Sequence, residues 1–166
     1  METASRPAAA RRGRRRCLRR RLPPMREMHV RLKDETIRLV RESVALLPAG
    51  DLEPVRVFYE RLFELAPDLR PMFKSNLDVQ VRKLADTLAW ITANLDAPGT
   101  LMTTLQQLGV RHAGYGVLDR HYAPVGSALI HMFHVTLGDR FTAAMEEAWL
   151  ETYTVISRDM ERGARQ

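Results

Sequence analysis

His112 is the side chain of this sequence that is best suited to bind a metal ion. It lies in the predicted last turn of a helix, just before Gly114 and Gly116, which favour a break. One ring nitrogen can donate a hydrogen bond to the carbonyl one turn earlier, that of Leu108. Such a bond fixes the tautomer and leaves the other nitrogen free as a ligand. A lone histidine at a helix end is more often structural, so the rest of the chain must decide its role.

Tyr59 and Gln80 are polar residues on the apolar faces of two other predicted helices. Tyr59 shares its face with Val55 and Leu62, and Gln80 lies one turn before Leu84. A buried tyrosine hydroxyl and a buried glutamine amide both need hydrogen-bond partners. One interpretation is that they face a polar ligand in a cavity, with His112 on the other side. The alternative is a core tyrosine with its hydroxyl at the surface and a solvated glutamine.

Other chemistry receives less support from the sequence. His131 and His134 share one predicted helix without a carboxylate at a matching spacing, so we interpret them as packing or surface residues. We find no Gly-rich phosphate loop, no serine-centred elbow and no cysteine pair. The single Cys17 excludes an internal disulfide and fits a reducing compartment, so we expect a cytoplasmic protein.

Helical periodicity of apolar residues continues from Asp34 almost to the end of the chain, and no alternating pattern indicates a strand. Pro and Gly residues separate the helices, and Asp34, Asp51, Asp78 and Asp119 are candidate caps or first-turn residues. We therefore predict an all-α fold with about six main helices and one or two short ones. The expected helices cover residues 34–47, 51–66, 67–73, 78–97, 100–112, 119–137 and 142–160.

The 166 residues suggest one domain, and no apolar run is long enough to span a membrane. The net charge of +6 comes from residues 1–27, which hold ten arginines and two acids, so the remainder is near −2. We predict that residues 1–33 form a disordered extension, residues 34–160 the domain and residues 161–166 a tail. The extension could contact nucleic acid or an anionic membrane, could be a targeting peptide, or could have no role.

Several short motifs occur in one order along most of the predicted domain. Together they resemble the globin domain of flavohaemoglobins and, more closely, the single-domain bacterial globins related to it. The resemblance covers roughly residues 34–160. The motifs are FYERLF at 58–63, MF at 72–73, QVRKL at 80–84, LGVRHAGYGV at 108–117, HY at 121–122 and AW at 148–149.

This resemblance implies a globin fold around haem b, with His112 as the proximal iron ligand. It also implies that Phe73 packs on the porphyrin and that Tyr122 is the tyrosine near the proximal histidine. In flavohaemoglobins that tyrosine acts with a glutamate five residues before the tryptophan. The corresponding residue here is Ala144, and Glu147 one turn further on is an uncertain substitute, which leaves a strong proximal effect in doubt.

On the distal side, the resemblance implies that Tyr59 and Gln80 donate hydrogen bonds to bound dioxygen and that Leu84 shapes the cavity. Donors held in a low-dielectric pocket stabilise the partial negative charge on oxygen. The implied activity is reversible dioxygen binding with nitric oxide dioxygenation. The chain ends at Gln166, so we expect no flavin or nicotinamide domain and hence an external reductase. Open alternatives are a pure dioxygen or sulfide binder and a gas sensor or interaction module whose Arg-rich extension contacts nucleic acid or membrane. A homodimer also remains open.

Overall fold

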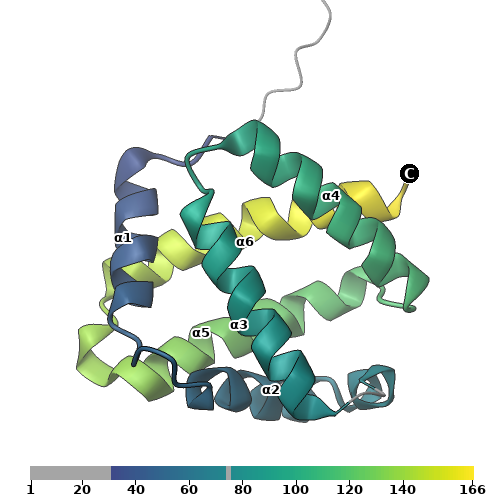
Figure 1. The fold of residues 1–166 in the computed structure, drawn as a ribbon, viewed down its shortest axis with the longest axis horizontal. Helices are drawn as coiled ribbons and strands as arrows, with labels where there is room; N and C mark the ends of the chain where they lie inside the picture. Colours follow the sequence, from purple (N-terminus) through teal and green to yellow (C-terminus); the bar gives the residue numbers. More distant parts are fainter. Residues whose placement is uncertain (1–30, 74–75) are drawn as a thin grey trace, which may run out of the picture.

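The computed structural model describes residues 31–73 and 76–166, which form six α-helices and three short 3-10 helices (Figure 1). No strand occurs in these residues, and the all-α prediction is confirmed. Most of the Arg-rich extension, including Cys17, and the corner residues Lys74 and Ser75 lie outside the described residues. The elements are α1 Asp34–Ala45, α2 Glu53–Leu65, η1 Pro67–Met72, α3 Leu77–Ala93, α4 Pro98–Gly114, η2 Asp119–His121, α5 Tyr122–Leu137, η3 Gly138–Arg140 and α6 Ala143–Ala164.

The six α-helices cross one another in two layers. In Figure 1, α1, α3 and α4 lie in front of α5 and α6, and α2 runs along the lower edge. Helix α4 packs on α6, α2 packs on α5, and α1 packs on α6. Helices α3 and α4 diverge from their common loop, so that their far ends lie apart (Figure 1). Those far ends carry Gln80 on α3 and His112 on α4.

Several helix ends differ from the sequence-based expectation. Helix α3 begins at Leu77, because the side chain of Asn76 accepts a hydrogen bond from the amide of Asp78. Helix α4 begins at Pro98, which was expected in a loop, because proline is tolerated in the first turn of a helix. Helix α5 follows the short helix η2, so its α-helical part begins at Tyr122 rather than Asp119.

The C-terminal residues do not form the separate tail that we expected at 161–166. Helix α6 continues to Ala164. Gly163 is buried in this last turn, where it lies against the backbone of Gln106 on α4. Close packing against another helix therefore explains this glycine better than helix termination does.

The core joins α1 to α6 through one buried hydrogen bond. The indole Nε1 of Trp149 donates to Ser43 Oγ at 2.7 Å, and Ser43 Oγ donates to the carbonyl of Val40 at 2.7 Å. Trp149 has no exposed surface, and its ring lies 4.8 Å from the ring of Phe133 on α5. This bond satisfies a polar group that would be costly to bury alone.

Helices α4 and α6 approach closely because each has a glycine at their crossing. A Cβ atom on Gly109 would lie 2.7 Å from the carbonyl carbon of Met160, and one on Gly163 would lie 2.6 Å from that of Gln106. Any side chain at either position would force the two backbones apart. Gly109 lies nearly one turn before His112, so this crossing fixes how closely the part of α4 that carries His112 packs on α6.

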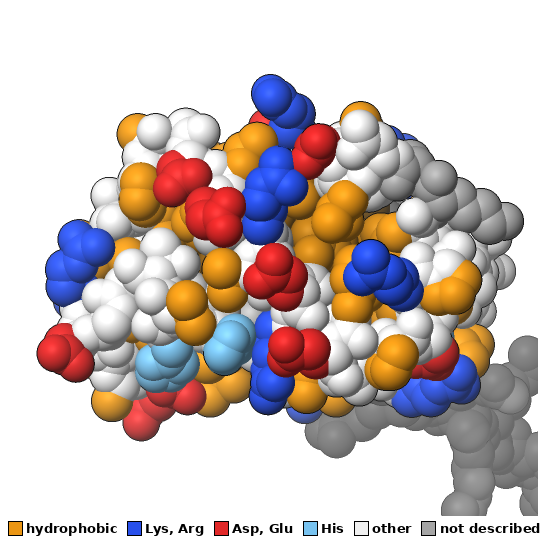
Figure 2. Space-filling view, turned by 90° about the horizontal axis from the view of Figure 1, so that it is seen from below, with side chains coloured by type: hydrophobic (Ala, Val, Ile, Leu, Met, Phe, Trp, Pro, Cys, Tyr) orange, Lys and Arg blue, Asp and Glu red, His pale blue; other side chains and the backbone are white. Residues whose placement is uncertain are grey.

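The surface carries charges of both signs. Figure 2 shows the face seen from below, where basic and acidic side chains are interspersed with hydrophobic ones. On this face, charges of one sign do not gather into a single patch. In the part of the chain that the structure describes, no helix is both long and apolar enough to cross a membrane.

Candidate functional site

His112 lies in the last turn of α4, and its side chain is partly buried. Its Nδ1 atom is 2.9 Å from the carbonyl oxygen of Leu108, which is the hydrogen bond expected from the sequence. A carbonyl only accepts, so Nδ1 carries the proton and the lone pair is on Nε2. Burial lowers the pKa of His112, and the bond to Leu108 opposes this effect. The ring is therefore neutral, as a metal-binding imidazole must be.

Tyr59 lies on α2 with its side chain buried, which excludes the alternative of a hydroxyl at the surface. The hydroxyl oxygen is 3.4 Å from the backbone carbonyl of Gln80 on α3, the long end of the hydrogen-bonding range. Burial raises the pKa of Tyr59 to about 12, so the phenol keeps its proton at neutral pH. The sequence-based interpretation has the two side chains facing each other across a ligand cavity, whereas the contact of Tyr59 seen here uses the backbone carbonyl of Gln80. Gln80 itself is partly buried.

Phe73 joins Tyr59 in an aromatic group because η1 folds back against the end of α2. The ring centroids of Tyr59 and Phe73 are 5.4 Å apart, and those of Phe63 and Phe73 are also 5.4 Å apart, both in edge-to-face contact. The guanidinium of Arg70 lies 5.1 Å from the centre of the Phe63 ring. This group brings Tyr59, the predicted distal residue, into contact with Phe73, the predicted porphyrin-packing residue.

Apolar side chains of the same elements could contact a flat apolar cofactor. Partly buried apolar side chains from three elements and a loop pack against the core, and Leu84 is among them. Together with the neutral His112 and its free Nε2, they offer one imidazole ligand and an apolar surface, which is what an iron porphyrin requires. The residues present therefore fit haem. These side chains are Met72 of η1, Leu84 and Leu88 of α3, Leu108 of α4 and Val117.

Tyr122 begins α5, and its environment contains a carboxylate that the sequence comparison missed. Burial raises the pKa of Tyr122, the charge of Glu161 on α6 raises it further, as does Asp119, and Arg165 opposes them. Arg165 also lies 3.6 Å from the carboxylate of Glu161. Ala144 and Glu147, the two positions near Trp149 considered from the sequence, are both exposed.

Glu161 lies well beyond Trp149 on α6 and about 120° away from it around the helix. No spacing counted from Trp149 therefore indicates it. Its charge acts on Tyr122 because α6 packs against α5.

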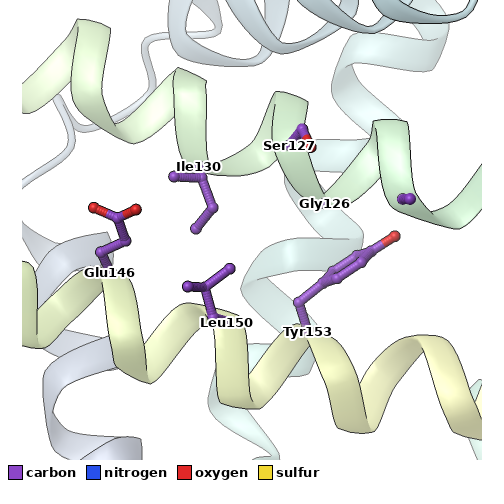
Figure 3. Close-up of a pocket in the computed structure, with 7 residues that line it drawn as sticks. Gly126, Ser127, Ile130, Glu146, Leu150 and Tyr153 are labelled. Carbon is purple, nitrogen blue, oxygen red and sulfur yellow. The ribbon is translucent and has the colours of Figure 1, made fainter.

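A separate hollow of about 410 Å³ lies between α5 and α6 (Figure 3). Ile130 and Leu150 point toward each other across it, and the ring of Tyr153 lies beside Gly126. A Cβ atom on Gly126 would be 2.7 Å from that ring. The hydroxyl of Tyr153 donates to the carbonyl of Tyr122 at 2.6 Å. The hollow is thus a packing feature beside the start of α5, and its lining includes none of the predicted site residues.

The two histidines interpreted as packing or surface residues lie on α5. His134 is exposed, and its Nε2 is 3.0 Å from a carboxylate oxygen of Glu146. His131 is partly buried.

Comparisons with known proteins identify the family. The globin family model matches residues 56–160. A flavohemoprotein of Xylella fastidiosa (strain Temecula1 / ATCC 700964) is 30% identical over 133 residues, which cover 78% of this chain and 33% of the relative. The chain thus spans about one third of the flavohemoprotein's length.

Two solved structures extend this comparison. One is an engineered carbene transferase built on RmaNOD, an inferred nitric oxide dioxygenase from Rhodothermus marinus. It has a TM-score of 0.72 and 29% identity, covering 81% of this chain and 94% of that one. A flavohemoglobin from Malassezia yamatoensis with bound FAD and heme shares the fold, with a TM-score of 0.68 and 24% identity, covering 81% and 37%. The chain therefore belongs to the globin family, and it is a haem b protein that binds gaseous ligands.

Proposed function

We propose that this globin binds dioxygen reversibly and uses it to convert nitric oxide to nitrate, with electrons from a separate reductase. The observation that carries the proposal is the buried hydroxyl of Tyr59 beside Gln80, in a chain where His112 presents a neutral ring with Nε2 free. Haem supplies the ferrous iron at which dioxygen binds and reacts.

His112 is the proximal ligand in this proposal. The carbonyl of Leu108 holds Nδ1–H, so the ring cannot rotate without losing a hydrogen bond 2.9 Å long. The same bond increases the basicity of Nε2. Phe73 would pack against the porphyrin, and Leu84 would limit the space available to the ligand. Tyr122, near the charge of Glu161, lies beside the proximal region.

Tyr59 is the main donor to bound dioxygen. Its aromatic ring is held by the rings of Phe58 and Phe73. Its hydroxyl keeps its proton at neutral pH, because burial raises the pKa of Tyr59 to about 12. A donor that is already ordered loses little entropy when the ligand arrives. Gln80 is the second donor, and its side chain has more torsions to fix before it can donate.

The comparisons support the catalytic half of the proposal. A flavohemoprotein and an engineered protein built on an inferred nitric oxide dioxygenase are among the relatives. The chain matches about one third of the flavohemoprotein. We propose that a separate reductase supplies the reducing equivalents. We also propose a cytoplasmic location, because the sequence has one cysteine.

The test is dioxygen dissociation measured by stopped flow in Tyr59→Phe. A hydrogen bond to a charged acceptor is worth about 1.5–3 kcal/mol. Loss of the hydroxyl should therefore raise the dissociation rate by about ten- to a hundredfold. Carbon monoxide, which carries less charge on its outer atom, should dissociate at a nearly unchanged rate. Tyr115→Phe is the matched control, because Tyr115 is 72% exposed. Equal effects on both gases would show that Tyr59 acts by size.

A second measurement separates turnover from simple binding. The protein is mixed with dioxygen, nitric oxide and a supplied flavin reductase, and nitrate formation is measured. We expect sustained nitrate formation that slows in Tyr59→Phe. Tight dioxygen binding without nitrate formation would leave a storage or delivery protein as the function.

A further inference from the structure

His121 is a buried histidine for which the proposed function has no use. It is the last residue of η2 and only 2% exposed. The backbone N–H of Leu118 donates to its Nδ1 at 3.1 Å, so Nδ1 carries no proton. The opposite nitrogen, Nε2, is then protonated and donates to a carboxylate oxygen of Asp68 at 3.3 Å. Both ring nitrogens therefore form hydrogen bonds, Nδ1 with nearby Leu118 and Nε2 with Asp68 on η1.

The local bond holds the loop that follows the proximal helix. The carbonyl of His112 accepts hydrogen bonds from the amides of Tyr115 at 3.1 Å and Val117 at 3.0 Å. Leu118 is the next residue, and its amide is the one that His121 holds. The end of α4 can therefore turn only if this loop moves with it.

The long-range bond reaches the opposite side of the site. Asp68 lies on η1, which ends at Met72 and is followed directly by Phe73. The guanidinium of Arg120 donates to Asp68 at 3.1 Å, and this bond, together with that from His121, lowers the pKa of the Asp68 carboxyl. Asp68 is thus an ionised acceptor at neutral pH, and a bond to it is stronger than one between neutral groups.

We propose that His121 is a positioning residue, which sets the orientation of the His112 ring relative to Phe73 by joining the loop after α4 to η1. The inference rests on the proposed role of His112 as the haem ligand. The two segments are distant in sequence, and the buried imidazole gives them a common reference point. A change on either side of the link is expected to alter the bond between His112 and haem.

Two substitutions at this position separate the two bonds. In His121→Asn, the side-chain oxygen can take the place of Nδ1 and hold Leu118, whereas the link to Asp68 is lost. In His121→Gln, the longer amide can reach Asp68, whereas the acceptor for Leu118 is lost. Asp68→Ala removes the same long-range bond from a residue whose side chain is 55% exposed. Arg120→Ala is the control, since it leaves the bond between His121 and Asp68 in place.

The readout is the iron–histidine stretching band of the ferrous holoprotein by resonance Raman, together with the rate of haem transfer to excess apomyoglobin. We expect His121→Asn and Asp68→Ala to shift or broaden the band alike and to speed haem transfer by about tenfold. The double variant of His121→Asn and Asp68→Ala should resemble either single variant, because both substitutions remove the same bond between His121 and Asp68. Arg120→Ala should leave the band unchanged, and His121→Gln should restore most of it.

Several outcomes would overturn the inference. An unchanged band and transfer rate in Asp68→Ala would show that the link does not position His112, even if the melting temperature falls. Additive effects in the double variant would show that the two residues act separately. If His121→Asn does not fold, Asp68→Ala still tests the link from the surface. A wild-type protein without an iron–histidine band would refute the proposed function instead, so the two failures are distinguishable.

Discussion

Gly109→Ala is the substitution that should most directly disturb α4, the helix that carries His112. The added Cβ atom would lie 2.7 Å from the carbonyl carbon of Met160. Non-bonded carbon atoms are comfortable at about 3.5–4.0 Å, and the carbonyl oxygen of Met160 would be closer still, so α4 and α6 must separate by at least roughly 1 Å. The obstacle is backbone rather than a flexible side chain. The overpacking should therefore cost about 1–3 kcal/mol.

The matched control is Gly114→Ala on the same helix. An added Cβ atom at Gly114 meets nothing within 4 Å. Alanine also has the better helix propensity, so this variant should be neutral or more stable by up to about 1 kcal/mol. Both positions lie close to His112 in sequence. The two variants therefore differ mainly in whether the crossing with α6 is disturbed.

Thermal unfolding and haem transfer measure the two consequences. For a chain of this size, 1 kcal/mol corresponds to about 2–4 °C, so the melting temperature of Gly109→Ala should fall by roughly 2–12 °C. Haem should also leave faster, because His112 moves with the displaced helix. If Gly109→Ala melts like Gly114→Ala and retains haem equally well, the glycine crossing does not position α4.

Four further predictions follow from the same structure. His112→Gly should lose its iron–histidine Raman band, and added imidazole should restore a five-coordinate ferrous spectrum; a wild-type spectrum without imidazole would exclude His112 as the ligand. Ser43→Ala should lower stability in urea by about 1–3 kcal/mol, because it leaves the buried Trp149 indole N–H without its acceptor. Dioxygen dissociation should be constant from about pH 6 to 10, because the raised pKa of about 12 keeps Tyr59 in its neutral, donating form until the solution is more alkaline. Removal of residues 1–27 should leave haem content and dioxygen affinity intact in absorption titrations.

Local pattern was enough to predict the fold and part of the site. Apolar periodicity located all six α-helices, since each buries one face against its neighbours. The bond from His112 to Leu108 was predictable because both atoms belong to one helical turn. The prediction that Tyr59 and Gln80 face the same region depended on their places on two amphipathic faces, and the structure brings α2 and α3 together there.

Features that depend on contacts between distant helices were not predictable. Gly163 reads locally as a helix terminator, but the approach of α4 makes it an interior residue of α6. The charge of Glu161 acts on Tyr122 only because α6 crosses the start of α5. The bond from His121 to Asp68 spans 53 residues, and no local spacing indicates it. Tertiary packing decided each of these features.

The burial of Trp149, where its indole donates to Ser43, also affects the intrinsic fluorescence of the protein. The chain has two tryptophans, and they differ in surroundings: Trp149 is fully buried, whereas Trp90 on α3 is 37% exposed. In the haem-free protein, emission from Trp149 reports whether α1 stays packed on α6. Emission from Trp90 lies at longer wavelength and reports the exposure of α3 to water. A Trp90→Phe variant would isolate the core signal. Intrinsic fluorescence can therefore distinguish an α3 that loosens alone from a core that opens, without any attached label.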